Sequence, residues 1–187
     1  MTDAPPDAAT PLAQAVFLDR DGTLNEDRGH LANPDDVVFF PQAAPALARL
    51  GGRYRLFIVT NQRGVAEGIL TPEQVEAVNR HVVAVLARAG VAISRVYTCP
   101  HLRSDGCACI KPNPHFLHRA AQEFGLDLAR SWVVGDHPHD VELARRAGAL
   151  GLYVLTGHGA KHRAELSPGT VVVPGIAEAV DWILAHS

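Results

Sequence analysis

The chain has 187 residues, of which 47% are hydrophobic and 20% charged, and its formal net charge is -3. This slight acidity argues against a nucleic-acid-binding surface, which needs clustered Lys and Arg, and no apolar run approaches the roughly 18 residues of a membrane span. We therefore expect a globular protein with one sizeable core that acts on a small molecule, with no nucleic acid or membrane as partner.

The first 14 residues are rich in Ala, Pro and Asp. They lack the basic start and the apolar centre of a secretory signal. We expect residues 1–14 to be a disordered leader and residues 15–187 to form a single domain. The protein is expected to be cytoplasmic and monomeric.

Strand and helix patterns alternate along the chain. Thr71, Pro72 and Gln74 together predict a capped helix start. In chain order, the patterns predict a strand at 15–18, an extended piece at 37–40, a helix at 45–50, a strand at 55–60, a helix from Thr71 to about Ala89, a strand at 93–98, a helix at 114–124, a strand at 132–135, a helix at 141–147, strands at 152–155 and 171–173, and a helix at 176–185. The alternation favours an α/β, Rossmann-like parallel sheet with helices on both faces.

Several polar side chains stand directly after predicted strands, or after the loop that follows a strand: Asp19, Asp21, Thr60, Asn61, Lys111 and Asp136. Any one of them also suits a turn or a cap, so the set carries the argument. The carboxyl ends of parallel strands share one edge of the sheet, where ligands bind. Two carboxylates there can hold a hard divalent cation with substrate phosphate. One carboxylate can also act as nucleophile while the other transfers protons.

Three cysteines and one histidine lie within a short loop, at Cys99, His101, Cys107 and Cys109. Four sulfur and nitrogen ligands describe a structural zinc site. The alternative is that the cysteines are small buried hydrophobes and the histidine a surface residue. Because the loop leads straight to Lys111, zinc binding would order that lysine's approach to the site.

Four motifs resemble those of the haloacid dehalogenase superfamily of phosphohydrolases: Asp19-Arg20-Asp21-Gly22-Thr23, Thr60-Asn61-Gln62, Lys111-Pro112, and Gly135-Asp136 with Asp140. The resemblance covers residues 15 to about 159 and implies a Rossmann-like core with catalytic Mg²⁺. It implies that the metal is held by Asp19, Asp21 and Asp136. We interpret Asp140 as a helix cap in preference to a metal ligand.

The same resemblance implies a catalytic set of Asp19, Asp21, Thr60, Asn61 and Lys111. Asp19 would be the nucleophile that takes the phosphoryl group, and Asp21 the general acid and base. Thr60 would hydrogen-bond the phosphoryl oxygens, and Lys111 would balance the charge of the phosphoaspartate.

The zinc loop and the lack of a large cap domain resemble one branch of the superfamily, which contains heptose 1,7-bisphosphate phosphatases and histidinol-phosphate phosphatases. The expected activity is a Mg²⁺-dependent phosphomonoesterase with a sugar bisphosphate as leading substrate and histidinol phosphate as the alternative. A phospho-accepting signalling module is a further alternative. Asp21 argues against that module, because a hydrolase needs a second carboxylate to activate water.

The chain departs from the heptose enzymes at several positions. Ile110 stands where they usually carry Arg, and His137 where Lys often follows the metal-binding Asp. We hypothesise that Arg63 partly replaces the missing Arg. The segment from Asp27 to His30 matches one that touches the sugar in the family. The candidate substrate-binding residues are therefore Asp27, Arg28, His30, Gln62 and Arg63.

Overall fold

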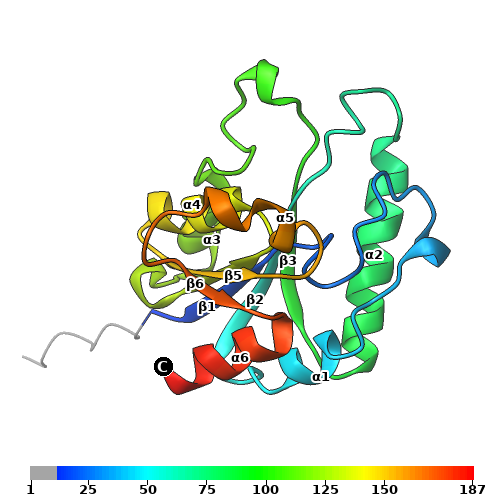
Figure 1. Ribbon diagram of the computed structural model, residues 1–187. Coiled ribbons are helices and arrows are strands. Elements are labelled where there is room, and N and C mark those ends of the chain that lie inside the picture. The colour runs from blue at the N-terminus through cyan, green and yellow to red at the C-terminus, as the bar shows by residue number, and fades with distance from the viewer. Residues whose placement is uncertain (1–11) are drawn as a thin grey trace, which may run out of the picture.

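The computed structural model describes residues 12–187, and Figure 1 shows a single sheet flanked by helices. All strand pairings in the sheet are parallel, and the spatial order is β3-β2-β1-β4-β5-β6. The direction of strand succession therefore reverses between β1 and β4. The strands are β1 (Gln14–Leu18), β2 (Tyr54–Asn61), β3 (Ile93–Cys99), β4 (Trp132–Gly135), β5 (Leu150–Val154) and β6 (Val171–Val173).

Helices cover both faces of this sheet. One apolar core lies beneath α1 (Ala43–Ala48), α2 (Pro72–Arg88) and α6 (Ile176–Ala185). A second core lies on the opposite face, beneath α3 (His115–Phe124) and α4 (Pro138–Ala147). A further short helix, α5 (Gly159–His162), follows β5, and single turns of 3-10 helix occupy Pro34–Asp36, Arg103–Asp105, Leu128–Arg130 and Arg163–Glu165.

The first strand shows why the sheet is buried on both sides. Val16 and Leu18 belong to the core beneath α1, α2 and α6, whereas Ala15 and Phe17 belong to the core beneath α3 and α4. Successive side chains of a strand point to opposite faces, so both sets must be apolar when both faces are covered. The predicted α/β parallel fold is confirmed, and no large cap domain is inserted within residues 12–187.

The predicted elements differ from the structure mainly at their ends. The extended piece predicted at 37–40 lies outside the six-stranded sheet and makes an isolated bridge between Phe39 and Asn25. The helix predicted at 141–147 begins three residues earlier, at Pro138, which suits a first helical position. The capped start at Thr71 is confirmed, because Thr71 and Gln74 exchange side-chain and backbone hydrogen bonds.

The predicted leader can be compared with the structure only at its end. Residues 1–11 lie outside the described part of the chain. Gln14 already belongs to β1, and the Ala13 N–H donates to the Gly125 carbonyl over 2.9 Å. Ala13 and Gln14, which the prediction assigned to the leader, are therefore part of the fold. No helix within residues 12–187 combines the length and apolar character needed to cross a membrane.

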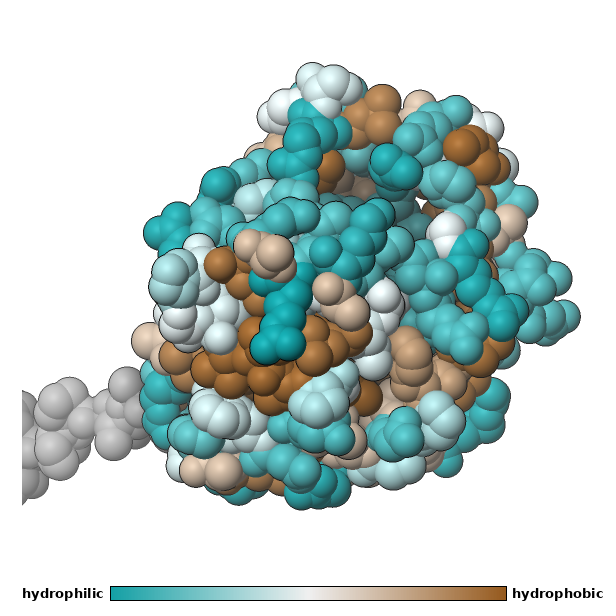
Figure 2. Space-filling view, viewed as in Figure 1, coloured by the Kyte–Doolittle hydropathy of each residue, from teal (hydrophilic) through white to brown (hydrophobic). Residues whose placement is uncertain are grey.

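The surface over β6 is more apolar than the surface of the loops at the carboxyl ends of the strands (Figure 2). Figure 2 shows an apolar area over β6 and the adjoining end of α6, while hydrophilic side chains dominate the loops above. Those loops rise from the carboxyl ends of the strands and include the segment between β3 and α3 (Figure 1). Several of the candidate site residues lie in these loops or next to them.

Candidate active site

A cavity of about 630 Å³ opens at the carboxyl edge of the sheet. It lies where the strand order reverses between β1 and β4, which is where open α/β sheets bind ligands. Its walls come from the ends of β1, β2 and β4, from the loop that follows β3, and from the start of α4. Among the residues that line it are Asp19, Asp21, Asp27, His30, Thr60, Asn61, Gln62, Arg63, Arg103, Ile110, Lys111, Asp136, His137, His139, Asp140 and His158.

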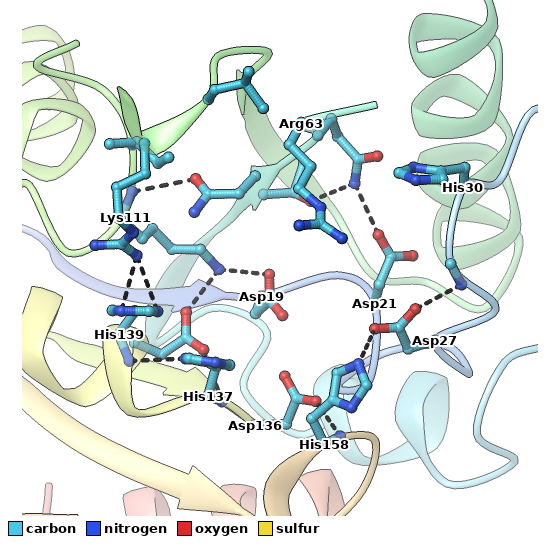
Figure 3. Close-up of a pocket in the computed structure, with 18 of the residues that line it drawn as sticks. Asp19, Asp21, Asp27, His30, Arg63, Lys111, Asp136, His137, His139 and His158 are labelled. Atoms are coloured by element: carbon cyan, nitrogen blue, oxygen red, sulfur yellow. Dashed lines mark hydrogen bonds and ion pairs between the residues drawn. The ribbon is translucent and has the colours of Figure 1, made fainter. Parts of the chain in front are cut away.

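Lys111 joins two carboxylates at the centre of this cavity (Figure 3). Its Nζ lies 2.6 Å from Asp19 Oδ1 and 2.7 Å from Asp140 Oδ1. The lysine side chain is buried, and the two carboxylates raise its pKa although burial opposes this. The structure therefore brings the predicted nucleophile and the predicted charge-balancing lysine into direct contact.

Asp19, Asp136 and Asp140 form an acidic cluster, with carboxylate oxygens that lie within 4.8 Å of one another. Burial, together with the negative charge of its two neighbours, raises the pKa of Asp136 to about 8. Burial raises the pKa of Asp19 to about 6 against the opposing effect of Lys111. The buried carboxylates of Asp136 and Asp140 and the partly buried carboxylate of Asp19 surround one ammonium, which leaves an excess of negative charge. Oxygen ligands with this charge fit a Mg²⁺ ion.

Two glycines allow Asp136 its position. Gly22 has φ +84°, and a Cβ there would collide with Asp136 Oδ2. Gly157 has φ +54° and meets the same oxygen. Only glycine adopts such backbone angles without strain and leaves room for the carboxylate. The His158 N–H then donates to Asp136 Oδ2 over 2.7 Å.

The carboxylate of Asp21 lies outside the acidic cluster. It accepts hydrogen bonds from Arg20 Nη2 (2.6 Å), Gln62 Nε2 (2.8 Å) and Asn25 Nδ2 (2.9 Å). Of the three predicted magnesium ligands, the structure groups the side chains of Asp19 and Asp136 but not that of Asp21. Asp140 completes the group in its place.

Asp140 caps α4, as the sequence predicts, and also contacts Lys111. One oxygen caps α4 by accepting from the His137 N–H over 3.1 Å. The other accepts from Lys111 Nζ. The predicted cap is thus present, and the same side chain also belongs to the acidic cluster.

Arg20 is a functional neighbour that sequence reasoning missed. Its guanidinium is fully buried, and its Nη1 donates to Asn79 Oδ1 over 2.7 Å. Asn79 lies on α2 and donates in turn to Thr98 Oγ1 over 3.0 Å. A chain of hydrogen bonds therefore runs from Asp21 through Arg20 to α2 and β3. The available signal was an arginine next to two aspartates at the end of a buried strand.

The residues at the end of β2 hold each other and the loop beyond. Thr60 Oγ1 accepts a hydrogen bond from Gln62 Nε2 over 2.8 Å. Asn61 Oδ1 accepts from the backbone N–H of Lys111 over 3.2 Å. Thr60 and Asn61 line the cavity as expected. The contact of Asn61 positions the lysine backbone.

Four of the five candidate substrate-binding residues line the cavity: Asp27, His30, Gln62 and Arg63. Arg28 does not, and its side chain is half exposed and paired with Glu26 at 3.0 Å. Asp27 Oδ2 lies 2.9 Å from His158 Nε2, across the cavity mouth (Figure 3). The side chain of Arg63 is 70% exposed and makes a long ion pair of 3.6 Å with Glu67.

His137 and His139, at the start of α4, line the cavity but were not predicted as site residues. The rings of His137 and His139 stack with their centroids 4.3 Å apart. Burial, together with the positive charges of His137 and Arg103, lowers the pKa of His139 to about 4. Arg103 Nη2 donates to His139 Nε2 over 2.9 Å. The histidine spacing along α4 was the only available signal.

Cys99, His101, Cys107 and Cys109 converge as the sequence predicts. Their sulfur–sulfur distances are 3.2–3.6 Å, and His101 Nδ1 lies 3.3 Å from Cys109 Sγ and 3.7 Å from Cys99 Sγ. Ligands about 2.0–2.3 Å from a tetrahedral zinc ion are separated by roughly 3.3–3.8 Å. All three thiols are free. The geometry and donor set therefore fit zinc.

The chain is similar to known proteins in both sequence and fold. A family model described as HAD-hydrolase-like matches residues 108–179. The D-glycero-beta-D-manno-heptose-1,7-bisphosphate 7-phosphatase of Bordetella bronchiseptica is 34% identical over 176 residues, which cover 92% of this chain and 98% of that protein. The D-glycero-D-manno-heptose-1,7-bisphosphate 7-phosphatase of Thermosynechococcus vestitus is 35% identical, with coverage of 92% and 96%.

A solved structure agrees with these sequence matches. The D,D-heptose 1,7-bisphosphate phosphatase from B. bronchiseptica, complexed with magnesium and phosphate, has a TM-score of 0.86 at 32% identity and covers 93% of this chain and 99% of that chain. The parallel sheet and its aspartate-lined edge define a HAD-like hydrolase fold. Within that class, the chain belongs to the D-glycero-D-manno-heptose-1,7-bisphosphate 7-phosphatase family.

Proposed function

We propose that this protein is a Mg²⁺-dependent phosphatase that removes the 7-phosphate of D-glycero-D-manno-heptose 1,7-bisphosphate. The observation that carries the proposal is the contact of Asp19 with Lys111 inside the acidic cluster, at the switch point of the sheet. The relatives named for this reaction match the chain over nearly its whole length and support the choice of substrate.

Asp19 supplies the nucleophile. One of its carboxylate oxygens bonds to the phosphorus of the ester while the bond from phosphorus to the sugar oxygen breaks. Asp19 and Asp136, with Asp140 beside them, would hold Mg²⁺, which would supply positive charge to offset the repulsion between the phosphate and the carboxylates. Lys111 contributes a second positive charge at Asp19, and the Thr60 hydroxyl, which lines the cavity, would donate to a phosphoryl oxygen.

Asp21 transfers the protons in both halves of the reaction. It donates one to the departing sugar oxygen, then takes one from the water that attacks the phosphorus and releases Asp19 and inorganic phosphate. Its hydrogen bonds to Arg20, Asn25 and Gln62 fix the carboxylate in one orientation. A second carboxylate that can activate the attacking water favours rapid turnover over a long-lived phosphorylated state.

The zinc site has a structural role in this proposal. Zinc held by the four Cys and His ligands would order the loop from 100 to 110, which packs few apolar side chains of its own. Asp27, His30, Gln62 and Arg63 would face the sugar from the opposite wall. We also propose that residues 15–187 act as one domain, as a monomer in the cytoplasm.

The experiment measures phosphate release with saturating Mg²⁺ from heptose 1,7-bisphosphate and from histidinol phosphate in parallel. We expect the bisphosphate to be strongly preferred, and Asp19→Asn to lose activity by at least about 10,000-fold. Preference for histidinol phosphate would overturn the proposed substrate. A phosphoaspartate that persists for minutes would overturn the hydrolase and favour a signalling module.

A further inference from the structure

Arg103 is a cation on the cavity wall that the proposed chemistry does not use. It lies in the 3-10 turn Arg103–Asp105, between the two halves of the Cys and His cluster. Its side chain lines the same cavity as Asp19 and Lys111. The neighbouring Ile110 also lines the cavity but offers only apolar surface there.

The cations of the cavity differ in how far their charge is already neutralised. Lys111 is held between Asp19 and Asp140, and Arg63 shares the carboxylate of Glu67. No carboxylate within residues 12–187 lies within 4.0 Å of the Arg103 guanidinium. A guanidinium that faces a cavity without an acidic partner is suited to an anionic group of the ligand.

The orientation of Arg103 is set by a histidine. Because a guanidinium can only donate, His139 Nε2 is the acceptor of the 2.9 Å contact with Arg103 Nη2. The His139 ring is itself fixed by stacking on His137. The other N–H groups of the Arg103 guanidinium have no hydrogen-bond partner in the described part of the chain. They remain able to bind two oxygens of a phosphate.

We propose that Arg103, positioned by His139, binds the second phosphate of a sugar bisphosphate, the one that is not hydrolysed. The proposal rests on the proposed function and assigns the bisphosphate preference to one residue. The cavity of about 630 Å³ holds more than the scissile phosphate, and Arg103 enters it from the cysteine loop. The loop that the thiols organise would therefore position a substrate contact.

The test compares heptose 1,7-bisphosphate with heptose 7-phosphate, which keeps the scissile phosphate and lacks the second one. The readout is the ratio of kcat/KM for the two substrates. In Arg103→Ala, we expect this ratio to fall about 10- to 100-fold, because a charge-assisted contact is lost. Activity on the monophosphate should change less than about 3-fold on the same basis. Arg88→Ala removes an exposed arginine at the end of α2 and is the matched control.

His139 is tested as a positioning residue through Arg103. We expect His139→Ala to lower the ratio by roughly 3- to 10-fold, and to have no added effect in the Arg103→Ala background. His139→Gln keeps a side-chain acceptor and should restore most of the ratio. Additive effects of the two alanine substitutions would overturn the positioning role.

The outcomes separate this inference from the proposed function. Loss of all 7-phosphatase activity in the unsubstituted protein would overturn the proposed function. Equal kcat/KM on the two substrates would overturn the second subsite while leaving a phosphatase. A bisphosphate preference that survives Arg103→Ala and disappears in Arg63→Ala would assign the contact to Arg63 and overturn the role of Arg103.

Discussion

The acidic cluster (Asp19, Asp136 and Asp140) and the cysteine cluster (Cys99, His101, Cys107 and Cys109) are supported by different parts of the fold. Asp19, Asp136 and Asp140 are anchored at the ends of buried strands and at a helix start, and Lys111 already links two of them. The cysteine cluster starts at the buried Cys99, at the end of β3. Its other ligands belong to a polar loop in which Cys107 and Cys109 are only partly buried.

The two clusters therefore differ in what holds their ligands in place: packing of the sheet in the acidic cluster, and a bound metal in the cysteine cluster. The sheet holds the acidic cluster because the strands that carry it are covered on both faces. A polar loop cannot bury enough apolar surface to offset the entropy of ordering its backbone. We therefore expect the acidic cluster to keep its shape without its metal, and the cysteine loop to depend on zinc.

The largest expected effect comes from breaking the acidic cluster at its cation. Lys111→Met keeps the length of the side chain and removes the charge that faces Asp19 and Asp140. We expect kcat to fall about 100- to 1,000-fold, as for loss of an electrostatic stabiliser. Metal-free protein should also lose about 3 kcal/mol of stability, because two buried carboxylates lose their partner. Stopped-flow phosphate release measures kcat, and urea unfolding measures the stability. An unchanged kcat would contradict the role of Lys111 as a catalytic cation.

The cysteine cluster, unlike the acidic cluster, should lose its shape when its metal is removed. Removing zinc with a chelator, followed by restoring Mg²⁺, should lower kcat/KM about 10- to 50-fold because the loop loses its ligand-imposed order. Hydrogen exchange should accelerate at residues 100–110 and change little in β1 and β4. Addition of Zn²⁺ should reverse both effects. Equal acceleration throughout the sheet would show that the metal stabilises the whole fold.

A smaller effect is expected from the chain of hydrogen bonds behind Asp21. Asn79→Ala leaves the buried Arg20 guanidinium without one acceptor and loosens its hold on Asp21. We expect roughly a ten-fold lower kcat on alkyl phosphates, whose leaving oxygen needs a proton. An aryl phosphate with a good leaving group should be hydrolysed nearly normally. Equal losses on both substrates would indicate general structural damage, and Arg80→Ala on the exposed side of α2 is the control.

The contrast between the two clusters also explains what the sequence could predict. Strand ends and cysteine spacing are local patterns in the sequence. They were enough to predict the parallel fold and the convergence of the four residues of the cysteine cluster. The contact between Asn79 and Arg20 joins positions 59 residues apart and depends on how α2 packs on the sheet. Single-residue patterns carry no information about such a pair.

The direction in which a polar side chain points was the second feature that the sequence could not predict. Asp19 and Asp21 stand two residues apart, and their shared polarity gave both a place among the magnesium ligands. In the structure, Asp21 turns toward Arg20 and Gln62, whereas Asp140 turns toward Lys111. These directions depend on partners from β2, the loop after β3 and α4. Arg28 likewise pairs with its neighbour Glu26 outside the cavity.

The acidic cluster should show its charge imbalance in the pH dependence of stability. The pKa of Asp136 is raised from 3.8 to about 8 without metal. The folded state then keeps a proton that the unfolded state releases near pH 4, so metal-free protein loses stability as the pH rises from about 4 to about 8. Saturating Mg²⁺ should therefore raise Tm by roughly 6–12 °C more at pH 8 than at pH 5.5. Differential scanning fluorimetry measures this, and Asp136→Asn should abolish the difference.

The smallest effect is expected at Arg28, which the sequence placed in the substrate site and the structure places outside the cavity. Its guanidinium pairs with Glu26, and both side chains are about half exposed. An exposed ion pair of this kind contributes at most about 1 kcal/mol. Arg28→Ala should change kcat/KM for the bisphosphate by less than about 2-fold, within the loss of such a surface contact. A loss as large as that expected for Arg103→Ala would mean that the loop from Asp27 to His30 closes over the substrate and carries Arg28 into the cavity.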